Sequence, residues 1–343
     1  MSDISLTQAR LRPDSTLHDC QLARRTTRDA SLQTYATVRF LVDRDLRSDA
    51  YRAYGYFRWL DDRLDGAGMD QGERLALVAS QQALVERCYQ GDPPAQATGE
   101  ESMLVDLIHN HPQNDGLQAY IRNLMGVMAF DAQRRGRLVS QAELDHYTGC
   151  LATAVTEALH YFIGHCCTPP QDQARLLAAS AAHVAHMLRD TFDDVEAGYY
   201  NIPGEYLETY RIGPQDVTSE PYRAWVKSRV RLARAWFNAG YGYLAQVETR
   251  RCRLAGYAYI GRFTQVLDSI EKDGYRLRRA YPECKRWSAS LAISWNVLKL
   301  ALFPRQSGIS PIQSLSLRGA ERRGNPRLLH PGKPSGVRND DLE

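Results

Sequence analysis

Two short acidic runs in this chain repeat aspartate at a spacing of four residues. Asp61 and Asp65 lie in YGYFRWLDDRLD, and Asp190 and Asp194 lie in RDTFDDVEAG. Residues four apart on a helix stand on the same face, where two like charges cost an isolated helix about 0.2–0.5 kcal/mol per pair. A positively charged partner is therefore expected at each pair.

Two helices that each carry an Asp-x-x-x-Asp pair are suited to binding Mg²⁺. This hard cation takes oxygen ligands, uses few carboxylates, and completes its shell with water and substrate phosphates. Facing pairs could hold two or three Mg²⁺ ions, which would bind a diphosphate and stabilise it as a leaving group. The alternative is that both runs are solvated helix faces paired with nearby arginines, because this spacing is common in helical proteins.

The elements that must position these pairs are helical by their apolar period. Apolar residues recur at spacings of three and four, and alternating β-branched segments are scarce. Helices are predicted over 48–65, 117–133, 143–165, 173–194, 220–247 and 254–282, with breaks where Pro, Gly and Asn cluster. We expect one all-α domain over residues 26–305, after an N-terminal extension, 1–25, and before a disordered tail, 306–343.

Composition narrows the class of protein. The 343 residues are 43% hydrophobic, enough for a substantial core, and the net charge of +3 gives no bias toward nucleic acid. The seven cysteines form no C-x-x-C pair, which favours reduced thiols over a disulfide framework or a zinc site. The longest apolar run, 290–303, is interrupted by Lys299 and is too short to be a transmembrane segment. A cytoplasmic protein is expected, with peripheral membrane contact left open.

The residues around the acidic pairs match two longer motifs. YGYFRWLDDRLD is similar to the pattern Y-A-F-x-R-x-x-D-D-x-x-D, with matches at Tyr54, Arg58, Asp61, Asp62 and Asp65. MLRDTFDDVEAGYYNIP is similar to N-I-L-R-D-x-x-E-D-x-x-x-G-R-x-Y-L-P, with matches at Leu188, Arg189, Asp190, Asp194 and Pro203. From about Thr26 to Leu302 the chain therefore resembles the squalene/phytoene synthase family of class I isoprenoid enzymes.

This resemblance implies a helical bundle with a central cavity and a Mg²⁺-dependent reaction. Asp61, Asp65, Asp190 and Asp194 would bind Mg²⁺ and the diphosphate of an allylic prenyl donor, which ionises to a cation. Arg58 and Arg189 would hold diphosphate oxygens through charge-assisted hydrogen bonds. Tyr54, Asp131, Tyr147 and Asn201 would be further substrate-binding residues. His186 stands at the position of the family's metal-binding Asn and is a further candidate ligand.

Several departures from the family motifs concern the second substrate. The family's H-x-K-S-F, which helps to hold a second prenyl diphosphate, is replaced by Ser31, Gln33 and Thr34 within SLQTY. The glycines of A-G-T-V-G, which break a helix beside the prenyl cavity, are absent from ATAVT at 152–156. Further replacements in family positions are His183 for Gln, Tyr199 for Arg, Asn201 for Tyr and Phe263 for Tyr.

These departures favour an acceptor without a diphosphate. The chain resembles the phytoene-synthase-like prenyltransferases of bacterial carbazole-alkaloid pathways, which attach a prenyl group to an aromatic carbon. The donor would be dimethylallyl, geranyl or a longer diphosphate, and His183, His186 or the released diphosphate would accept the proton lost by the ring. The first alternative is head-to-head condensation of two prenyl diphosphates to squalene, phytoene or dehydrosqualene. The second is a non-catalytic assembly factor of the same fold.

Overall fold

The computed structural model describes residues 13–66, 68–97, 99–164 and 167–282, in which every regular element is a helix. The α-helices are α1 (Pro13–Ala30), α2 (Leu32–Phe40), α3 (Arg47–Asp65), α4 (Gln71–Tyr89), α5 (Gly99–Asn110), α6 (Asp115–Arg134), α7 (Gln141–Gly164), α8 (Leu177–Ala197), α9 (Gly204–Tyr210), α10 (Glu220–Gln246) and α11 (Arg250–Lys272). The predicted all-α class is confirmed. No described helix combines the length and the apolarity that a membrane span requires.

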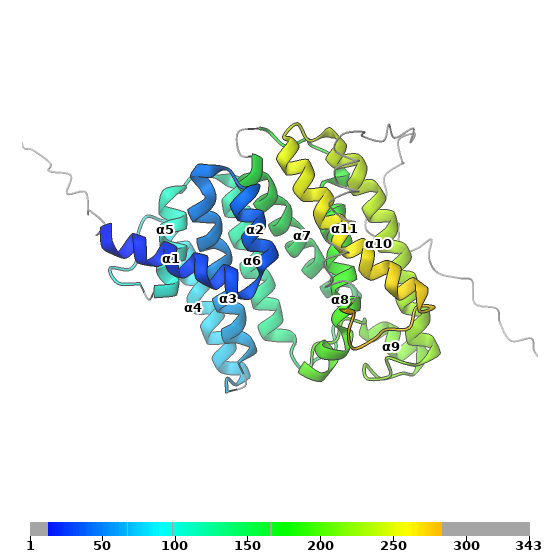
Figure 1. Cartoon of the computed structure of the whole chain (residues 1–343). Coiled ribbons are helices and arrows are strands. Elements are labelled where there is room, and N and C mark those ends of the chain that lie inside the picture. Colours follow the sequence, from blue (N-terminus) through cyan, green and yellow to red (C-terminus); the bar gives the residue numbers. More distant parts are fainter. Residues whose placement is uncertain (1–12, 67, 98, 165–166, 283–343) are drawn as a thin grey trace, which may run out of the picture. The chain divides into compact units, whose positions relative to one another are not determined.

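Four helices form the row that positions the acidic pairs. α3 packs against α6, α6 against α7, and α7 against α8 (Figure 1). α4 and α5 pack at the α3 and α6 end of this row, and α10 and α11 pack at the α8 end. The two helices that carry the acidic pairs, α3 and α8, are therefore separated by α6 and α7.

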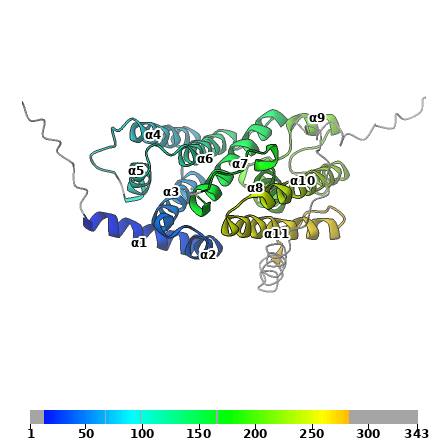
Figure 2. The same cartoon turned by 90° about the horizontal axis from the view of Figure 1, so that it is seen from above.

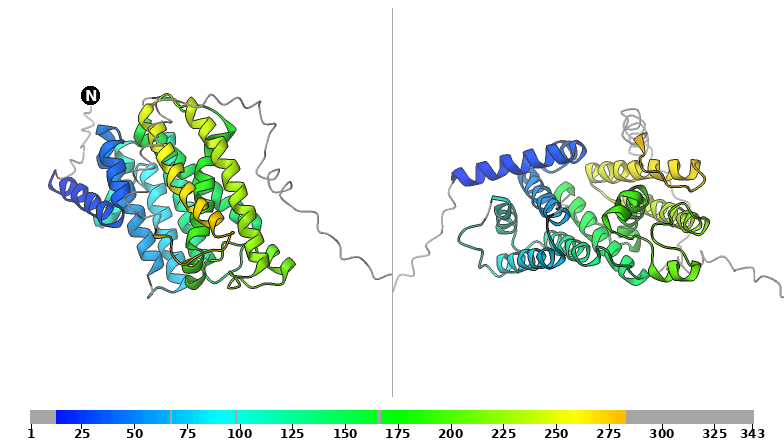
Figure 3. Two further views of the ribbon diagram at one scale, coloured as in Figure 1. Left: turned by 45° about the vertical axis from the view of Figure 1, so that its right-hand side comes forward. Right: turned by 90° about the horizontal axis from the view of Figure 1, so that it is seen from below.

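α1, α2 and α11 lie on one side of this row (Figures 2 and 3). α1 packs against α3, and the predicted boundary between residues 25 and 26 falls within α1. The predicted disordered tail, 306–343, lies outside the described residues. The domain limits thus stay a prediction.

The apolar period explains how α3 presents its aspartates. Tyr56, Leu60 and Leu64 recur every four residues, and all three are buried in the core. Asp61 and Asp65 each follow one of these leucines by one residue, so they lie on the adjoining face of the helix. Burial of the apolar stripe therefore fixes the direction in which the carboxylates point.

A glycine ends α8 and turns the chain back toward the cavity. Gly198 has a φ of 87° in the left-handed region, where a side chain is disfavoured. The Gly198 N–H donates to the Val195 carbonyl at 3.2 Å, and the Tyr199 N–H donates to the Asp194 carbonyl at 2.7 Å. This turn brings Tyr199 and Asn201 back beside the last turn of α8.

One helix agrees with its sequence-based prediction and another differs from it. α7 runs unbroken from Gln141 to Gly164, close to the predicted 143–165, so ATAVT at 152–156 continues the helix. α11 ends at Lys272, and the helix predicted as far as residue 282 is wrong beyond that point. Gly274 and Tyr275 have φ values of 64° and 66°, a backbone conformation that cannot continue a right-handed helix.

Candidate active site

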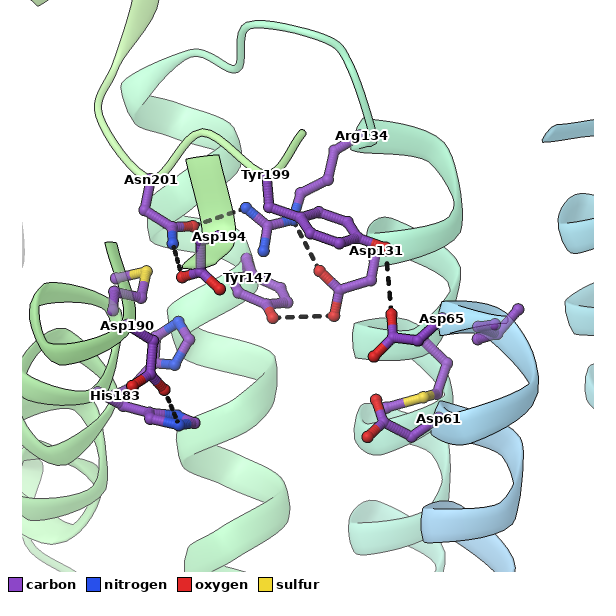
Figure 4. A pocket seen from close by; sticks show the side chains of 14 residues that line it. Asp61, Asp65, Asp131, Arg134, Tyr147, His183, Asp190, Asp194, Tyr199 and Asn201 are labelled. Atoms are coloured by element: carbon purple, nitrogen blue, oxygen red, sulfur yellow. Dashed lines mark hydrogen bonds and ion pairs between the residues drawn. The ribbon is translucent and has the colours of Figure 1, made fainter. Parts of the chain in front are cut away.

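The two acidic pairs line one cavity of about 240 Å³ between α3, α6, α7 and α8. Asp61 and Asp65 project from α3 on one side, and Asp190 and Asp194 project from α8 on the opposite side (Figure 4). The remaining lining residues are Leu64, Met128, Asp131, Arg134, Tyr147, His183, His186, Met187, Tyr199 and Asn201. The fold thus places two acidic pairs, 125 or more residues apart in sequence, in the lining of one cavity.

Most of the predicted site residues line this cavity, but Arg58, Arg189 and Tyr54 do not. Arg58 pairs with Asp61 at 3.1 Å and also with Asp62. These arginines are the positively charged partners expected from the sequence, because Arg189 likewise binds a motif aspartate. Both arginines form ion pairs with carboxylates of the cavity, although neither arginine lines the cavity itself.

Asp190 is held by two neighbours on its own helix. Arg189 Nε and Nη2 each donate to one carboxylate oxygen of Asp190 at 2.6 Å. His186 Nε2 lies 2.8 Å from Asp190 Oδ2. Burial opposes ionisation of Asp190, but these hydrogen bonds and charges outweigh it and hold the pKa of the carboxyl well below its usual range. Asp190 is therefore the permanently charged member of its pair.

Arg134 at the end of α6 is a buried cation that sequence reasoning missed. Its Nε donates to Asp131 Oδ1 at 2.7 Å, and its Nη1 donates to Asn201 Oδ1 at 2.7 Å. The guanidinium also lies over the rings of Tyr147 and Tyr199, at 4.9 and 5.0 Å from their centroids. The spacing of three residues between Asp131 and Arg134 was the available sequence signal.

The Arg134 bonds are part of a network that reaches from α7 to α8 (Figure 4). Tyr147 donates its hydroxyl to Asp131 Oδ2 at 2.9 Å. At the other end, Asn201 Nδ2 donates to Asp194 Oδ2 at 2.7 Å. Asp131, Arg134 and Asn201 therefore connect the cavity wall to one of the motif aspartates.

Tyr199 contacts both sides of the cavity. Its hydroxyl donates to Asp65 Oδ1 at 3.5 Å, a long hydrogen bond, while its ring packs against the Arg134 guanidinium. Tyr199 stands where the resembled family has an arginine, so the sequence suggested a lost cation. The structure places Arg134 beside it, and this end of the cavity keeps a guanidinium supplied by a different helix.

Two carboxyls in the cavity have raised pKa values. Burial and the nearby charge of Asp190 raise the pKa of Asp194 to about 7, although Arg134 opposes the shift. Burial and Asp65 raise the pKa of Asp61 to about 6. Burial is the larger cause of both shifts, and repulsion from a neighbouring carboxylate adds to it.

This carboxylate set fits Mg²⁺. The described residues contain no group of three or more His, Cys, Asp or Glu that could hold an ion by themselves. Mg²⁺ does not require one, because it is bound through one or two carboxylates together with water and substrate phosphates. A divalent cation between the α3 and α8 pairs would favour the ionised forms of Asp61 and Asp194, which burial and neighbouring carboxylates disfavour.

The raised pKa of Asp194 gives a testable pH dependence. Its pKa of about 7 lies above the ordinary value of 3.8, so the native state binds more protons than the unfolded state between these values. This carboxyl therefore lowers stability as the pH rises through that window. Without Mg²⁺, Asp194→Asn is expected to melt at a higher temperature than the wild type near pH 8, and the difference should shrink toward pH 4.

Mg²⁺ should raise the melting temperature of the wild type more near pH 8 than near pH 5, because ligand carboxyls must be deprotonated. The Mg²⁺-dependent shift of Asp194→Asn should be smaller at both values. Thermal melts with and without the metal measure all four quantities. A wild type that melts at a higher temperature than Asp194→Asn near pH 8 without Mg²⁺ would contradict this prediction. It would show that the charge of Asp194 does not destabilise the protein.

Comparison with known proteins supplies the family context. The sequence model of the squalene/phytoene synthase family matches residues 27–288 of the chain. The 15-cis-phytoene synthase of Synechococcus elongatus is 24% identical over 283 residues, covering 76% of this chain and 88% of that protein. The 15-cis-phytoene synthase of Synechocystis sp. is 30% identical over 133 residues, covering 37% and 39%.

Solved structures show the same fold. The squalene synthase HpnC from Alicyclobacillus acidocaldarius superposes with a TM-score of 0.62 at 20% identity, covering 78% of this chain and 98% of that one. A dehydrosqualene synthase superposes with a TM-score of 0.64 at 13% identity, covering 83% and 97%. With the family match over most of its length, this chain belongs to the squalene/phytoene synthase family.

Proposed function

We propose that this protein is a Mg²⁺-dependent prenyltransferase that ionises an allylic prenyl diphosphate and transfers the prenyl group to a small aromatic acceptor without a diphosphate. The family and the fold support a prenyltransferase. The acceptor would be an indole-like or carbazole-like compound of secondary metabolism, because residues 31–34 lack the family's second diphosphate-binding motif.

The donor half depends on the opposed carboxylates. Asp61, Asp65, Asp190 and Asp194 would hold Mg²⁺, with His186 beside them as a further candidate ligand. When bound, the metal supplies charge neutralisation to the diphosphate and makes it a better leaving group. The apolar side chains of Leu64, Met128 and Met187 line the same cavity and would keep water from an allylic cation.

The proposed absence of a diphosphate on the acceptor depends on residues 31–34. These residues begin a helix and include no cation. Ser31 is the N-cap of α2, and its Oγ accepts hydrogen bonds from the Thr34 N–H at 3.2 Å and the Thr34 hydroxyl at 2.9 Å. Gln33 is exposed. Both hydroxyls are committed to the helix end, and no cation stands at the position of the family's lysine. This single observation supports an acceptor that needs no second diphosphate cradle.

Ring substitution also requires loss of a proton from the attacked carbon. The aromatic carbon forms the new C–C bond with the allylic cation, and the proton then leaves to a base. Burial lowers the pKa of His183 to about 3, so this imidazole is a weak base. The released diphosphate would lie in the same cavity and is the expected proton acceptor.

Head-to-head condensation of two prenyl diphosphates is the second candidate function. The relatives named as phytoene synthases and the guanidinium of Arg134 in the cavity favour it. Arg134 could bind an additional anion in this reaction. The substitutions at residues 31–34 weigh against it.

A product assay separates the two functions. Purified protein is incubated with Mg²⁺ and dimethylallyl, geranyl or farnesyl diphosphate, with and without a hydroxycarbazole or hydroxyindole. The proposed function predicts a prenylated ring and no prenyl dimer. Dimeric hydrocarbon formed without any acceptor would instead establish the head-to-head reaction.

We also propose a cytoplasmic location. The cysteines of the described residues, Cys20, Cys88, Cys150, Cys167 and Cys252, are free thiols, which is typical of reducing compartments.

A further inference from the structure

His183 is a buried polar side chain in the cavity wall without a hydrogen-bond partner. It lies on α8, is only 5% exposed, and contributes to the lining of the cavity. Neither Nδ1 nor Nε2 has a partner among the described residues. The ring instead meets the Tyr147 ring edge to face, with centroids 4.9 Å apart.

A neutral imidazole carries one donor and one acceptor, and leaving both unpaired in a protein interior is unfavourable. Buried polar groups are almost always satisfied, so an exception in a cavity wall suggests a group that arrives with a ligand. The nearest aromatic neighbour does not supply a partner, since the Tyr147 hydroxyl donates to Asp131.

The other polar side chains of the cavity are all engaged. The carboxylates bind Arg58, Arg189, Arg134, Asn201 or the tyrosine hydroxyls, and His186 binds Asp190. Among the described residues that line the cavity, His183 is thus the polar side chain left without a hydrogen bond or ion pair.

His183 also lies N-terminal to the acidic pair of α8. It precedes Asp190 by seven residues on the same helix, or about 10 Å at 1.5 Å per residue. A prenyl chain has no heteroatom with which to pair. The partner should therefore be a neutral polar group on the body of the second substrate.

We propose that His183 recognises the acceptor through a hydrogen bond to its ring N–H or ring hydroxyl, and so selects hydroxylated or N–H heteroaromatic acceptors. This inference depends on the proposed aromatic prenyl transfer. Both ring nitrogens are buried in the unliganded protein, so the proposal requires the imidazole to turn when the acceptor binds. His183 then acts in specificity and leaves proton removal to another group.

Matched acceptors test this role. A hydroxycarbazole is compared with its O-methyl and N-methyl derivatives, and kcat/KM is measured for each with a fixed Mg²⁺ and donor concentration. The wild type should prefer the free N–H or O–H acceptor to the methylated one by about tenfold, the effect of one good hydrogen bond. His183→Phe should lower this ratio to near one, and His183→Gln, which keeps a donor and an acceptor, should retain part of it.

His146→Phe is the matched control, because His146 is exposed on α7 outside the cavity lining, and it should keep the wild-type ratio. A wild-type ratio near one overturns the inference without any variant. So does a His183→Phe enzyme that keeps the wild-type ratio, or one in which only the KM of the donor changes. Failure of the wild type to prenylate any aromatic acceptor would instead remove the proposed function, and this inference with it.

Discussion

Asp190→Asn is expected to lower the rate of diphosphate release by about a thousandfold, because metal-ion stabilisation of developing charge supplies several kcal/mol and each 1.36 kcal/mol is tenfold. The pKa of Asp190 is held below its usual range by hydrogen bonds and charges from Arg189 and His186, against the effect of burial. Asparagine keeps the size of the side chain and removes the charge. The measurement is release of diphosphate from the allylic donor at saturating Mg²⁺.

Asp193→Asn is the control for this change. Asp193 is exposed and is not part of the cavity lining, so its variant should keep the wild-type rate. Both variants remove one negative charge from α8, at positions three residues apart. The comparison therefore separates a specific role of Asp190 from a general effect of net charge. Equal loss in both variants, or full activity of Asp190→Asn, would contradict a direct role for the α8 pair.

Arg134→Met is expected to destabilise the protein by about 3–5 kcal/mol, the usual cost of removing one partner from a buried ion pair. The Arg134 side chain is 6% exposed, and its loss would leave Asp131 without its main charge partner and Asn201 without a donor. Burial already raises the pKa of Asp131, so the loss should grow as the pH rises and this carboxyl ionises. Urea unfolding at two pH values measures both effects.

A double variant tests the physical reason. Asp131→Asn removes the charge that Arg134→Met leaves unpaired, so the combination should be more stable than the sum of the single losses predicts. Arg134→Lys should restore little, because an ammonium cannot make the two directed bonds of the planar guanidinium. Additive single losses would mean that the two side chains do not form an energetically coupled pair.

The acidic pairs could be predicted from the sequence because their geometry is local. Spacing of four residues on a helix places two carboxylates on one face, and the apolar stripe of Tyr56, Leu60 and Leu64 sets the direction of that face. The helices that carry the site were predicted almost to their ends for the same reason. The facing of α3 and α8 required the family resemblance as well, since spacing alone also fits solvated surfaces.

The environment of the pairs depends on contacts between distant residues and could not be predicted in the same way. Arg134 follows Asp131 by three residues, but its second partner, Asn201, is 67 residues away. The place of Asn201 depends in turn on the turn at Gly198. Sequence comparison registered Tyr199 as a lost arginine and did not show that Arg134 lies against its ring.

One error has a simple physical cause. α11 ends ten residues before the predicted limit at residue 282, because the apolar pattern continues into a segment where Gly274 and Tyr275 turn the backbone left-handed. This error does not affect the helices that carry the acidic pairs.

Calorimetric binding of a non-ionising thiolodiphosphate analogue of the donor tests the central claim most directly. If opposed aspartates on α3 and α8 bind a diphosphate through Mg²⁺, the analogue should bind the wild type only in the presence of Mg²⁺. Both Asp61→Asn and Asp190→Asn should strongly weaken the binding of the analogue. Binding of equal strength without the metal, or unchanged binding in both variants, would contradict the account.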